Sequence, residues 1–138
     1  MSRQAVIVDT NVVVAGLLTG NAASPVARIL DGMLAAAFPF VVSEALLAEY
    51  RAVLVRPALR KQHGLTVTEV ETLLTDIAHH AIVLAPAVGS PAPEPGDQLL
   101  WNLLAARENP LLVTGDQALQ DDAAMRARVL SPRAFVDG

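Results

Sequence analysis

The sequence predicts an α/β domain with a central parallel sheet, and three observations support this fold class. Short β-branched and leucine-rich runs alternate with segments that carry apolar residues at helical spacing. The length of 138 residues suits a single domain, residues 1–138, and an apolar share of 53% is enough for a full core. Two strand-like runs are closely followed by an aspartate, Asp9 after Val8 and Asp116 after Thr114-Gly115. The expected architecture has three α/β/α layers, with helices on both faces of the sheet.

The first half of the chain predicts two strands and three helical segments. β-branched runs give strands at Ala5–Val8 and Phe40–Val42. Ser24-Pro25 starts a helix, because serine caps helix N-termini and proline fits the first helical position, and Pro39 ends it. Ser43 caps the next helix. In order, the helical segments cover Asn11–Leu18, for which a tight turn is the alternative, Ser24 to before Pro39, and Ser43 to about Val55.

The second half continues the alternation of helices and strands. Thr66 and Glu69 form a capping-box pattern ahead of a helix that ends near His80. Asp97 opens another helix after the proline-rich loop Pro86–Gly96. Ser131-Pro132 starts a last helical turn after a short helix that follows Asp116. The predicted strands are Ile82–Leu84, Leu111–Thr114 and an edge strand at Arg128–Leu130.

Composition restricts the function classes. The formal net charge is −4, which does not suggest a non-specific nucleic-acid coat. The absence of cysteine excludes disulfides, thiolate catalysis and cysteine-based metal sites. The most apolar stretch, Met33–Val42, is too short to span a bilayer and is broken by Pro39. We therefore expect a cytoplasmic protein without a membrane partner.

Four acidic residues are the main functional candidates: Asp9, Glu49, Asp97 and Asp116. Asp9 and Asp116 directly follow predicted strands, at the carboxyl end where ligands bind in α/β sheets. Asp97 would enter from a helix start. Glu49 lies at the edge of the apolar stripe of its helix, whereas Glu44 points to the far side. Clustered carboxylates repel one another unless a cation neutralises them, so the pattern predicts a divalent-metal site.

Each candidate also has a structural interpretation. Asp9, Asp97 and Asp116 are all suitable helix caps or turn residues, and Glu49 alone would pass for a solvated helix acid. The four together favour a site, with Asp9, Asp97 and Asp116 as metal ligands and Mg²⁺ or Mn²⁺ as the metal. Two polar helpers are expected to bind substrate or orient the acids, Asn11 and Thr114, although helix initiation and strand propensity are their alternatives.

The order of these segments carries a family resemblance. Strand–Asp-Thr-Asn, helix–Glu, Gly-Asp–helix and strand–Thr-Gly-Asp together resemble the PIN-domain family of metal-dependent ribonucleases, from Ala5 to Phe135. The Val-Asp-Thr-Asn and Val-Thr-Gly-Asp segments are the most specific parts. Many bacterial members of this size are toxins of type II toxin–antitoxin modules, similar to the virulence-associated protein C type.

The resemblance implies a PIN-like fold and an endoribonuclease that uses Mg²⁺ or Mn²⁺ to cleave RNA. It implies catalytic roles for Asp9, Glu49, Asp97 and Asp116. It also implies a partner antitoxin protein and a homodimer. For the dimer, the apolar segment Ile29–Phe40 is expected to offer more surface than one small sheet needs to cover.

One segment departs from the family pattern. Relatives often carry a cluster of acids here, whereas this chain has Glu94-Pro-Gly-Asp97-Gln98. Gln98 cannot supply a carboxylate's charge, so the number of bound metal ions, one or two, stays open. Glu94 or Asp121 would be a weak substitute for the missing acid. The alternative hypothesis is therefore a catalytically degenerate PIN-like domain that binds metal or RNA as a regulator.

A basic run follows Glu49, comprising Arg51, Arg56, Arg60 and Lys61. It has two interpretations. These side chains would suit contacts to RNA phosphates. They would equally suit a solvated helix end, where cations are favoured by the helix dipole.

Overall fold

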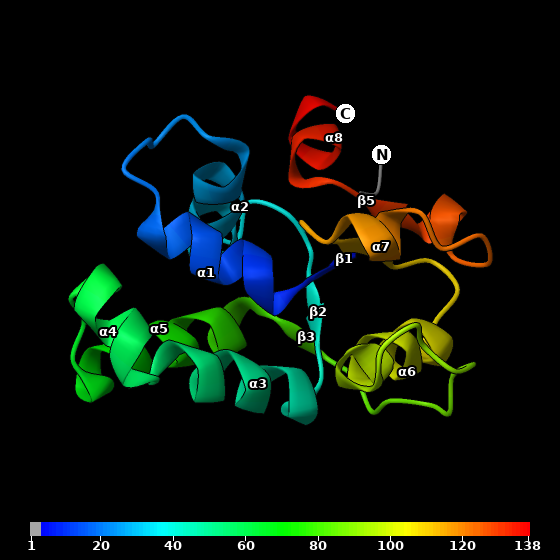
Figure 1. The fold of residues 1–138 in the computed structure, drawn as a ribbon, viewed down its shortest axis with the longest axis horizontal. Coiled ribbons are helices and arrows are strands. Elements are labelled where there is room, and N and C mark those ends of the chain that lie inside the picture. The colour runs from blue at the N-terminus through cyan, green and yellow to red at the C-terminus, as the bar shows by residue number, and fades with distance from the viewer. Residues whose placement is uncertain (1–3) are drawn as a thin grey trace.

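The computed structural model describes residues 4–138, so the first three residues of the predicted domain lie outside it. Helices surround a small set of strands at the centre of the molecule (Figure 1). The strands are β1 Val6–Val8, β2 Val41–Val42, β3 Ile82–Val83, β4 Leu111–Val113 and β5 Val129–Leu130. The α-helices are α1 Thr10–Leu18, α2 Pro25–Leu34, α3 Glu44–Leu54, α4 Pro57–His63, α5 Val67–His80, α6 Gln98–Ala106, α7 Gln117–Gln120 and α8 Pro132–Asp137. Two 3-10 turns, η1 Pro95–Asp97 and η2 Arg126–Arg128, complete the described elements.

All strand pairs in the described chain are parallel, which confirms the predicted α/β class. They form two ladders, β1-β4-β5 and β2-β3, in place of the single sheet expected. One parallel bridge between Val6 and Phe40 joins the ladders, supported by a hydrogen bond from the Val6 N–H to the Pro39 carbonyl. The junction stays this short because Pro39, just before Phe40, has no N–H to extend the pairing.

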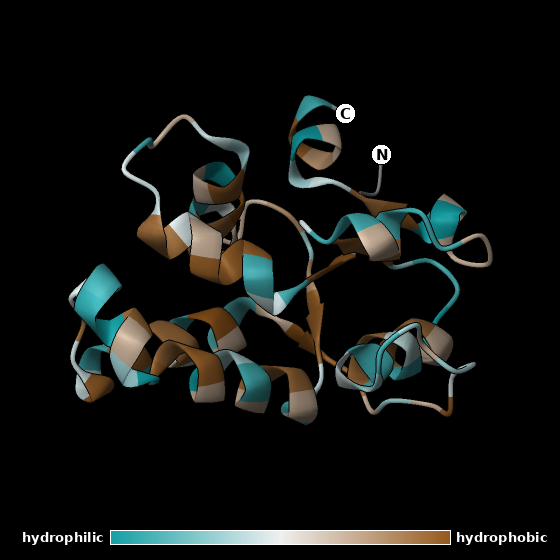
Figure 2. Ribbon diagram, in the orientation of Figure 1, coloured by the Kyte–Doolittle hydropathy of each residue, from teal (hydrophilic) through white to brown (hydrophobic). Residues whose placement is uncertain are grey.

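The core lies between the strands and the inner faces of the helices. The central strands are strongly hydrophobic (Figure 2), and β1 is at most 1% exposed. Trp101 is fully buried on α6. Burying such large apolar side chains contributes roughly 1.5–3 kcal/mol each, so this core is the main source of stability.

The predicted capping residues are observed at four helices. The side chains of Ser24, Ser43 and Ser131 accept hydrogen bonds from backbone N–H groups of the helices that they precede. Thr66 and Glu69 form the complete capping box at α5. These contacts satisfy N–H groups that a helix leaves without partners, at about 1 kcal/mol each.

The segment after Pro57 was not predicted as a helix but forms α4. Pro57 occupies its first turn, where a missing N–H costs nothing, and Gly64 ends it in the left-handed conformation, φ 72°. None of its residues is buried, so the helix has no apolar stripe for a pattern to detect.

Much of the apolar surface expected at Ile29–Phe40 is buried inside the protein. Ile29, Met33 and Phe40 are at most 1% exposed and belong to the core. Phe38 packs edge-on against Phe135 of α8, with ring centroids 5.1 Å apart. The C-terminal helix therefore covers part of this face, whereas Ala35, Ala36 and Ala37 stay exposed.

One arginine ties the C-terminal strand to its neighbours. The guanidinium of Arg128, just before β5, donates to the carbonyls of Leu104, Arg107 and Pro110, at 2.7–2.9 Å. Burial lowers the pKa of Arg128 from its usual value. The contacts connect the end of α6, the turn before β4 and the start of β5.

None of the helices formed by residues 4–138 combines the length and apolarity that crossing a membrane requires.

Candidate active site

Asp9 stands at the carboxyl end of β1 and is only 7% exposed. It occupies the N-cap position of α1, but its side chain makes no capping hydrogen bond. Instead, its Oδ2 accepts hydrogen bonds from the Thr114 hydroxyl at 2.7 Å and from Asn11 Nδ2 at 3.3 Å. The register of β1 with β4 brings Asp9 beside Thr114. The Asp9 carboxylate is therefore held by the neighbouring strand end and by Asn11 in the first turn of α1.

Asn11 connects the ends of β1 and β4. Its Nδ2 donates to Asp9 and to the Thr114 hydroxyl, both at 3.3 Å, and its Oδ1 accepts from the Gly115 N–H at 3.0 Å. The Thr114 hydroxyl also accepts from the Asp116 N–H at 3.0 Å. Asn11 and Thr114 thus orient Asp9 and the turn that carries Asp116.

Glu49 enters from the middle of α3. It is partly buried, whereas Glu44 on the same helix is exposed, as the apolar stripe predicted. The hydroxyl of Thr10, the residue after Asp9, donates to Glu49 Oε2. The next residue, Tyr50, is fully buried and its hydroxyl donates to the Val8 carbonyl. Two consecutive side chains of α3, Glu49 and Tyr50, therefore fix this helix to the end of β1 and the start of α1.

Asp97 and Asp116 complete the group from two further helix starts. Asp116 Oδ1 accepts the Ala118 N–H at 2.9 Å, so one of its oxygens caps α7. Asp97 is half-buried before α6 and makes no capping hydrogen bond with its side chain. Capping therefore explains part of the placement of Asp116 and does not explain that of Asp97.

Burial and neighbouring carboxylates raise the pKa of two of the acids, Asp9 and Asp97. Burial is the main cause that raises the pKa of Asp9 to about 6, with smaller contributions from the charges of Asp97 and Glu49. The Thr114 hydroxyl and the backbone of Thr10 oppose this shift. Burial also raises the pKa of Asp97, and the charges of Asp116, Glu49 and Glu94 add to it. The fold therefore brings all four candidate acids into one electrostatic field.

The PIN domain family model matches residues 5–118, a range that contains all four acids. This chain belongs to the PIN domain family. None of the curated proteins compared with the chain is similar enough to count as a relative. PIN domains are generally nucleases and typically use divalent metal ions. The elements η2, β5 and α8 lie beyond the matched range.

The chemistry of this PIN domain's donor set suits a hard cation. Its candidate ligands are carboxylate oxygens, which Mg²⁺ and Mn²⁺ prefer, and their mutual repulsion would be relieved by a bound cation. As placed, no three acidic or histidine side chains of residues 4–138 form a group that would hold a metal ion. Among the candidate ligands, Asp9 has its carboxylate held by hydrogen bonds from both Thr114 and Asn11.

Gln98 stands where the family pattern often has an acid, and Asp121 and Glu94 are the possible substitutes for that acid. The side chains of Gln98 and Asp121 make hydrogen bonds elsewhere. Gln98 accepts the Ala92 N–H and donates to the Ser90 carbonyl and to Asn102 Oδ1, so it organises the preceding loop. Asp121 accepts from Gln117 Nε2 at 3.0 Å. Glu94 is exposed and contributes only through its charge on Asp97.

Sequence reasoning missed two side chains that support the site of this PIN domain. Thr10 holds Glu49, and Tyr50 supports the backbone just before Asp9. Their positions beside Asp9 and Glu49 in the sequence were the available signal. Their partners lie about forty residues away, so the contacts become visible only in the folded chain.

Proposed function

We propose that this PIN domain is a metal-dependent endoribonuclease that hydrolyses RNA phosphodiester bonds with Mg²⁺ or Mn²⁺. The single observation that carries the proposal is the buried carboxylate of Asp9, aimed at the end of β4 and electrostatically coupled to Asp97 and Glu49. A buried acid that makes no helix cap and is surrounded by other acids suits cation binding better than a structural role.

In this mechanism, Asp9, Asp97 and Asp116 would hold the metal. The bound ion supplies a polarised water and stabilises charge on the phosphate oxygens. Asn11 and Thr114 keep Asp9 oriented through hydrogen bonds to Oδ2. Glu49, fixed by the Thr10 hydroxyl, holds a carboxylate at the same edge, where it accepts a proton from the attacking water.

Cleavage assays on purified variants test this function. Asp9→Asn, Asp97→Asn and Asp116→Asn are each expected to abolish Mn²⁺-dependent RNA cleavage while the melting temperature stays at or above that of the wild type, because each removes a repelled charge. Asp76→Asn, an exposed acid on α5, is the matched control and should cleave normally. A site variant that still cuts, or that melts far lower, contradicts the assigned role.

Metal binding has a separate test. Mg²⁺ or Mn²⁺ should raise the melting temperature of the wild type by mass action, and Asp9→Asn should lose most of this rise. Calcium should bind but support poor cleavage, because its longer and looser coordination misplaces the attacking water. Calorimetry that detects no divalent-ion binding at millimolar concentration would exclude the metal site.

A second candidate function is a catalytically degenerate PIN domain that binds RNA or metal as a regulator. It is favoured by Gln98, whose side chain faces the loop and adds no charge to the acids. RNA binding without cleavage in the presence of Mn²⁺ would select this function over the nuclease.

We further propose, from the family resemblance, that the enzyme is a cytoplasmic toxin controlled by an antitoxin and that it pairs into a homodimer. Co-expression with the neighbouring gene should relieve growth arrest and yield a complex. Light scattering at micromolar concentration should give a dimer mass. If co-expression neither relieves growth arrest nor yields a complex, the toxin assignment is refuted and the nuclease proposal stands. A strictly monomeric mass would refute the homodimer.

A further inference from the structure

A basic surface lies on α4, away from the acids. Four of the ten basic residues of this acidic chain fall between Arg51 and Lys61. No aspartate or glutamate occurs in residues 50–68. The local charge is therefore strongly positive although the net charge of the whole chain is −4.

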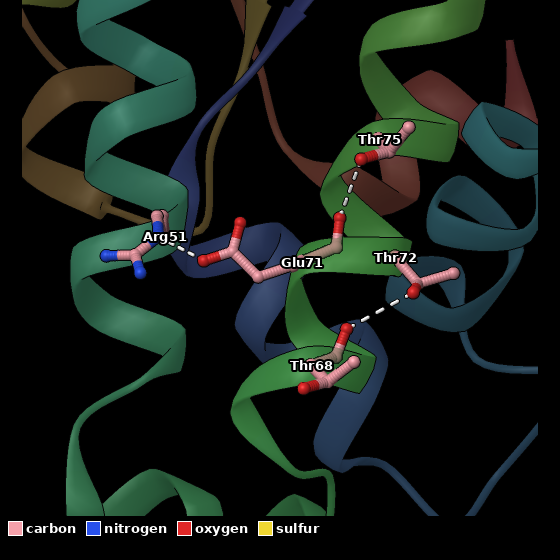
Figure 3. Close-up of polar contacts among 5 residues, drawn as sticks. All are labelled: Arg51, Thr68, Glu71, Thr72 and Thr75. Atoms are coloured by element: carbon pink, nitrogen blue, oxygen red, sulfur yellow. Dashed lines mark hydrogen bonds and ion pairs between the residues drawn. The ribbon is translucent and has the colours of Figure 1, made fainter.

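One of the four basic residues is neutralised within the fold. Arg51 of α3 points to Glu71 of α5, and its Nε lies 2.5 Å from Glu71 Oε1 (Figure 3). The other three, Arg56, Arg60 and Lys61, form no ion pair with any residue from 4 to 138. We call these three residues the α4 basic surface. Their charge is available to a partner outside the chain.

The α4 basic surface borders an open hollow. A cavity of about 390 Å³ is lined by Pro57, Arg60, Lys61, Gly64, Leu65 and Thr66. The Nε of Arg60 is buried and has no hydrogen-bond partner, although Arg60 as a whole is half-buried. A buried donor without a partner is unfavourable, and the positive charge of the Arg60 guanidinium would attract an anion to the hollow that this residue lines.

The position of α4 connects this surface to the acids. α4 packs against both α1 and α3, the helices that follow Asp9 and carry Glu49 (Figure 1). Arg56 comes seven residues after Glu49 and just beyond the end of α3, so the backbone between them spans roughly 10 Å. At about 3.4 Å of rise per stacked nucleotide, that distance corresponds to a few nucleotides.

We propose that the α4 basic surface binds backbone phosphates of a single-stranded RNA whose scissile bond lies at the four acids. This inference rests on the proposed ribonuclease function and adds its substrate-binding surface. Residues 51–80 contain no phenylalanine, tryptophan or tyrosine, and the His63 ring on α4 is held by the backbone of Leu54 and Leu65, so the surface has no large aromatic platform on which bases would stack. The contacts are therefore to phosphates and independent of base sequence.

The test measures binding and cleavage separately. Binding of a short fluorescent single-stranded RNA of mixed sequence to the Asp9→Asn protein, in EDTA, is followed by anisotropy over a range of salt concentrations. The triple change Arg56→Gln, Arg60→Gln and Lys61→Gln should weaken binding about tenfold or more at low salt. It should also reduce the slope of log affinity against log salt by about 2, since each single-strand phosphate contact contributes about 0.7.

Matched variants separate this role from a general loss of charge or folding. The double change Arg107→Gln and Arg126→Gln removes two exposed charges that precede β4 and β5, toward the amino ends of these strands. It should leave the slope of log affinity against log salt unchanged. The double change Arg56→Gln and Lys61→Gln keeps the half-buried Arg60 and should reduce the slope by about 1.4. In the cleaving protein, this double change should raise KM several-fold and leave kcat unchanged.

The possible results distinguish the inference from the proposed function. Normal cleavage by the α4 variants, with an unchanged KM and an unchanged salt slope, would overturn the inference but leave the proposed ribonuclease function intact. A surface that binds an acidic protein instead of RNA would give this result. Loss of RNA binding in the α4 variants, with no cleavage by the wild type in Mn²⁺, would support the surface and refute the ribonuclease. An equal loss in the Arg107 and Arg126 control would overturn the assignment to α4.

Discussion

The hydroxyl of Thr114 donates a 2.7 Å hydrogen bond to the carboxylate of Asp9 although 105 residues separate them. The parallel pairing of β1 with β4 creates this contact, and both side chains are buried. The same hydroxyl accepts the N–H of Asp116. Thr114 is therefore the group through which the first and last candidate acids are held in a fixed relation.

Replacing Thr114 with valine should weaken both the fold and the site. The change keeps the shape but removes the donor to Asp9 and the acceptor for Asn11 and Asp116. We expect the free energy of unfolding to fall by about 1–3 kcal/mol, because buried polar groups lose their partners. The pKa of Asp9 should rise further. Urea unfolding measures the first effect, Thr114→Ser is the control that keeps the hydroxyl, and unchanged stability would contradict the assigned role.

The stability of the metal-free protein should decrease as pH rises through 6. Burial raises the pKa of Asp9 from 3.8 to about 6 in the folded state, so folding favours its protonated form. This contribution is fully present below pH 3.8 and is lost as pH rises through about 6, by about 3 kcal/mol in total. Unfolding in EDTA at several pH values, compared with Asp9→Asn, isolates the effect. Equal pH dependence in both proteins would refute it.

The Tyr50→Phe change should lower stability without removing metal binding. It deletes the hydroxyl that donates to the Val8 carbonyl in the core while keeping the ring. We expect a loss of about 1–2 kcal/mol in the free energy of unfolding, typical of a buried acceptor that loses its donor. Divalent-ion binding by calorimetry should persist, because the hydroxyl contacts no carboxylate. A loss of binding equal to that of Asp9→Asn would show that Tyr50 belongs to the ligand set.

The Arg128→Gln change should destabilise the C-terminal part of the fold. Three carbonyls, from Leu104, Arg107 and Pro110, lose a charged donor. We expect a loss of about 2–4 kcal/mol, since hydrogen bonds to charged groups contribute more than neutral ones. Arg126→Gln is the matched control, because this neighbour is exposed and should change the stability by less than about 0.5 kcal/mol. Equal effects in the two variants would contradict the role of Arg128.

Local signals predicted much of the fold. Ser24, Ser43, Thr66 and Ser131 cap helices as expected, because a cap needs only its own residue and the next turn. The strands leading to Asp9 and Asp116 were also predicted, since continuous apolar runs of this kind are typical of buried parallel strands. The inward position of Glu49 followed from the period of its helix.

The remaining features depend on tertiary structure. The period of an apolar stripe shows which face of a helix is buried but not what covers it, and Phe135 packs on Phe38 within the segment that was expected to be a free surface. α4 was missed because it buries no residue. The contacts of Thr10 with Glu49 and of Tyr50 with Val8 join residues about forty positions apart, and no local pattern specifies such pairs.

The pairing of β1 with β4 also determines when the protein can act during its own synthesis. A chain that has emerged from the ribosome only as far as α5 contains Asp9 and Glu49 but neither the partner strand nor the remaining acids. Domains generally fold as units, so the completed N-terminal half waits for its C-terminal partner. The group of four acids is therefore incomplete on the ribosome until translation has passed Asp116 and β4 has paired with β1.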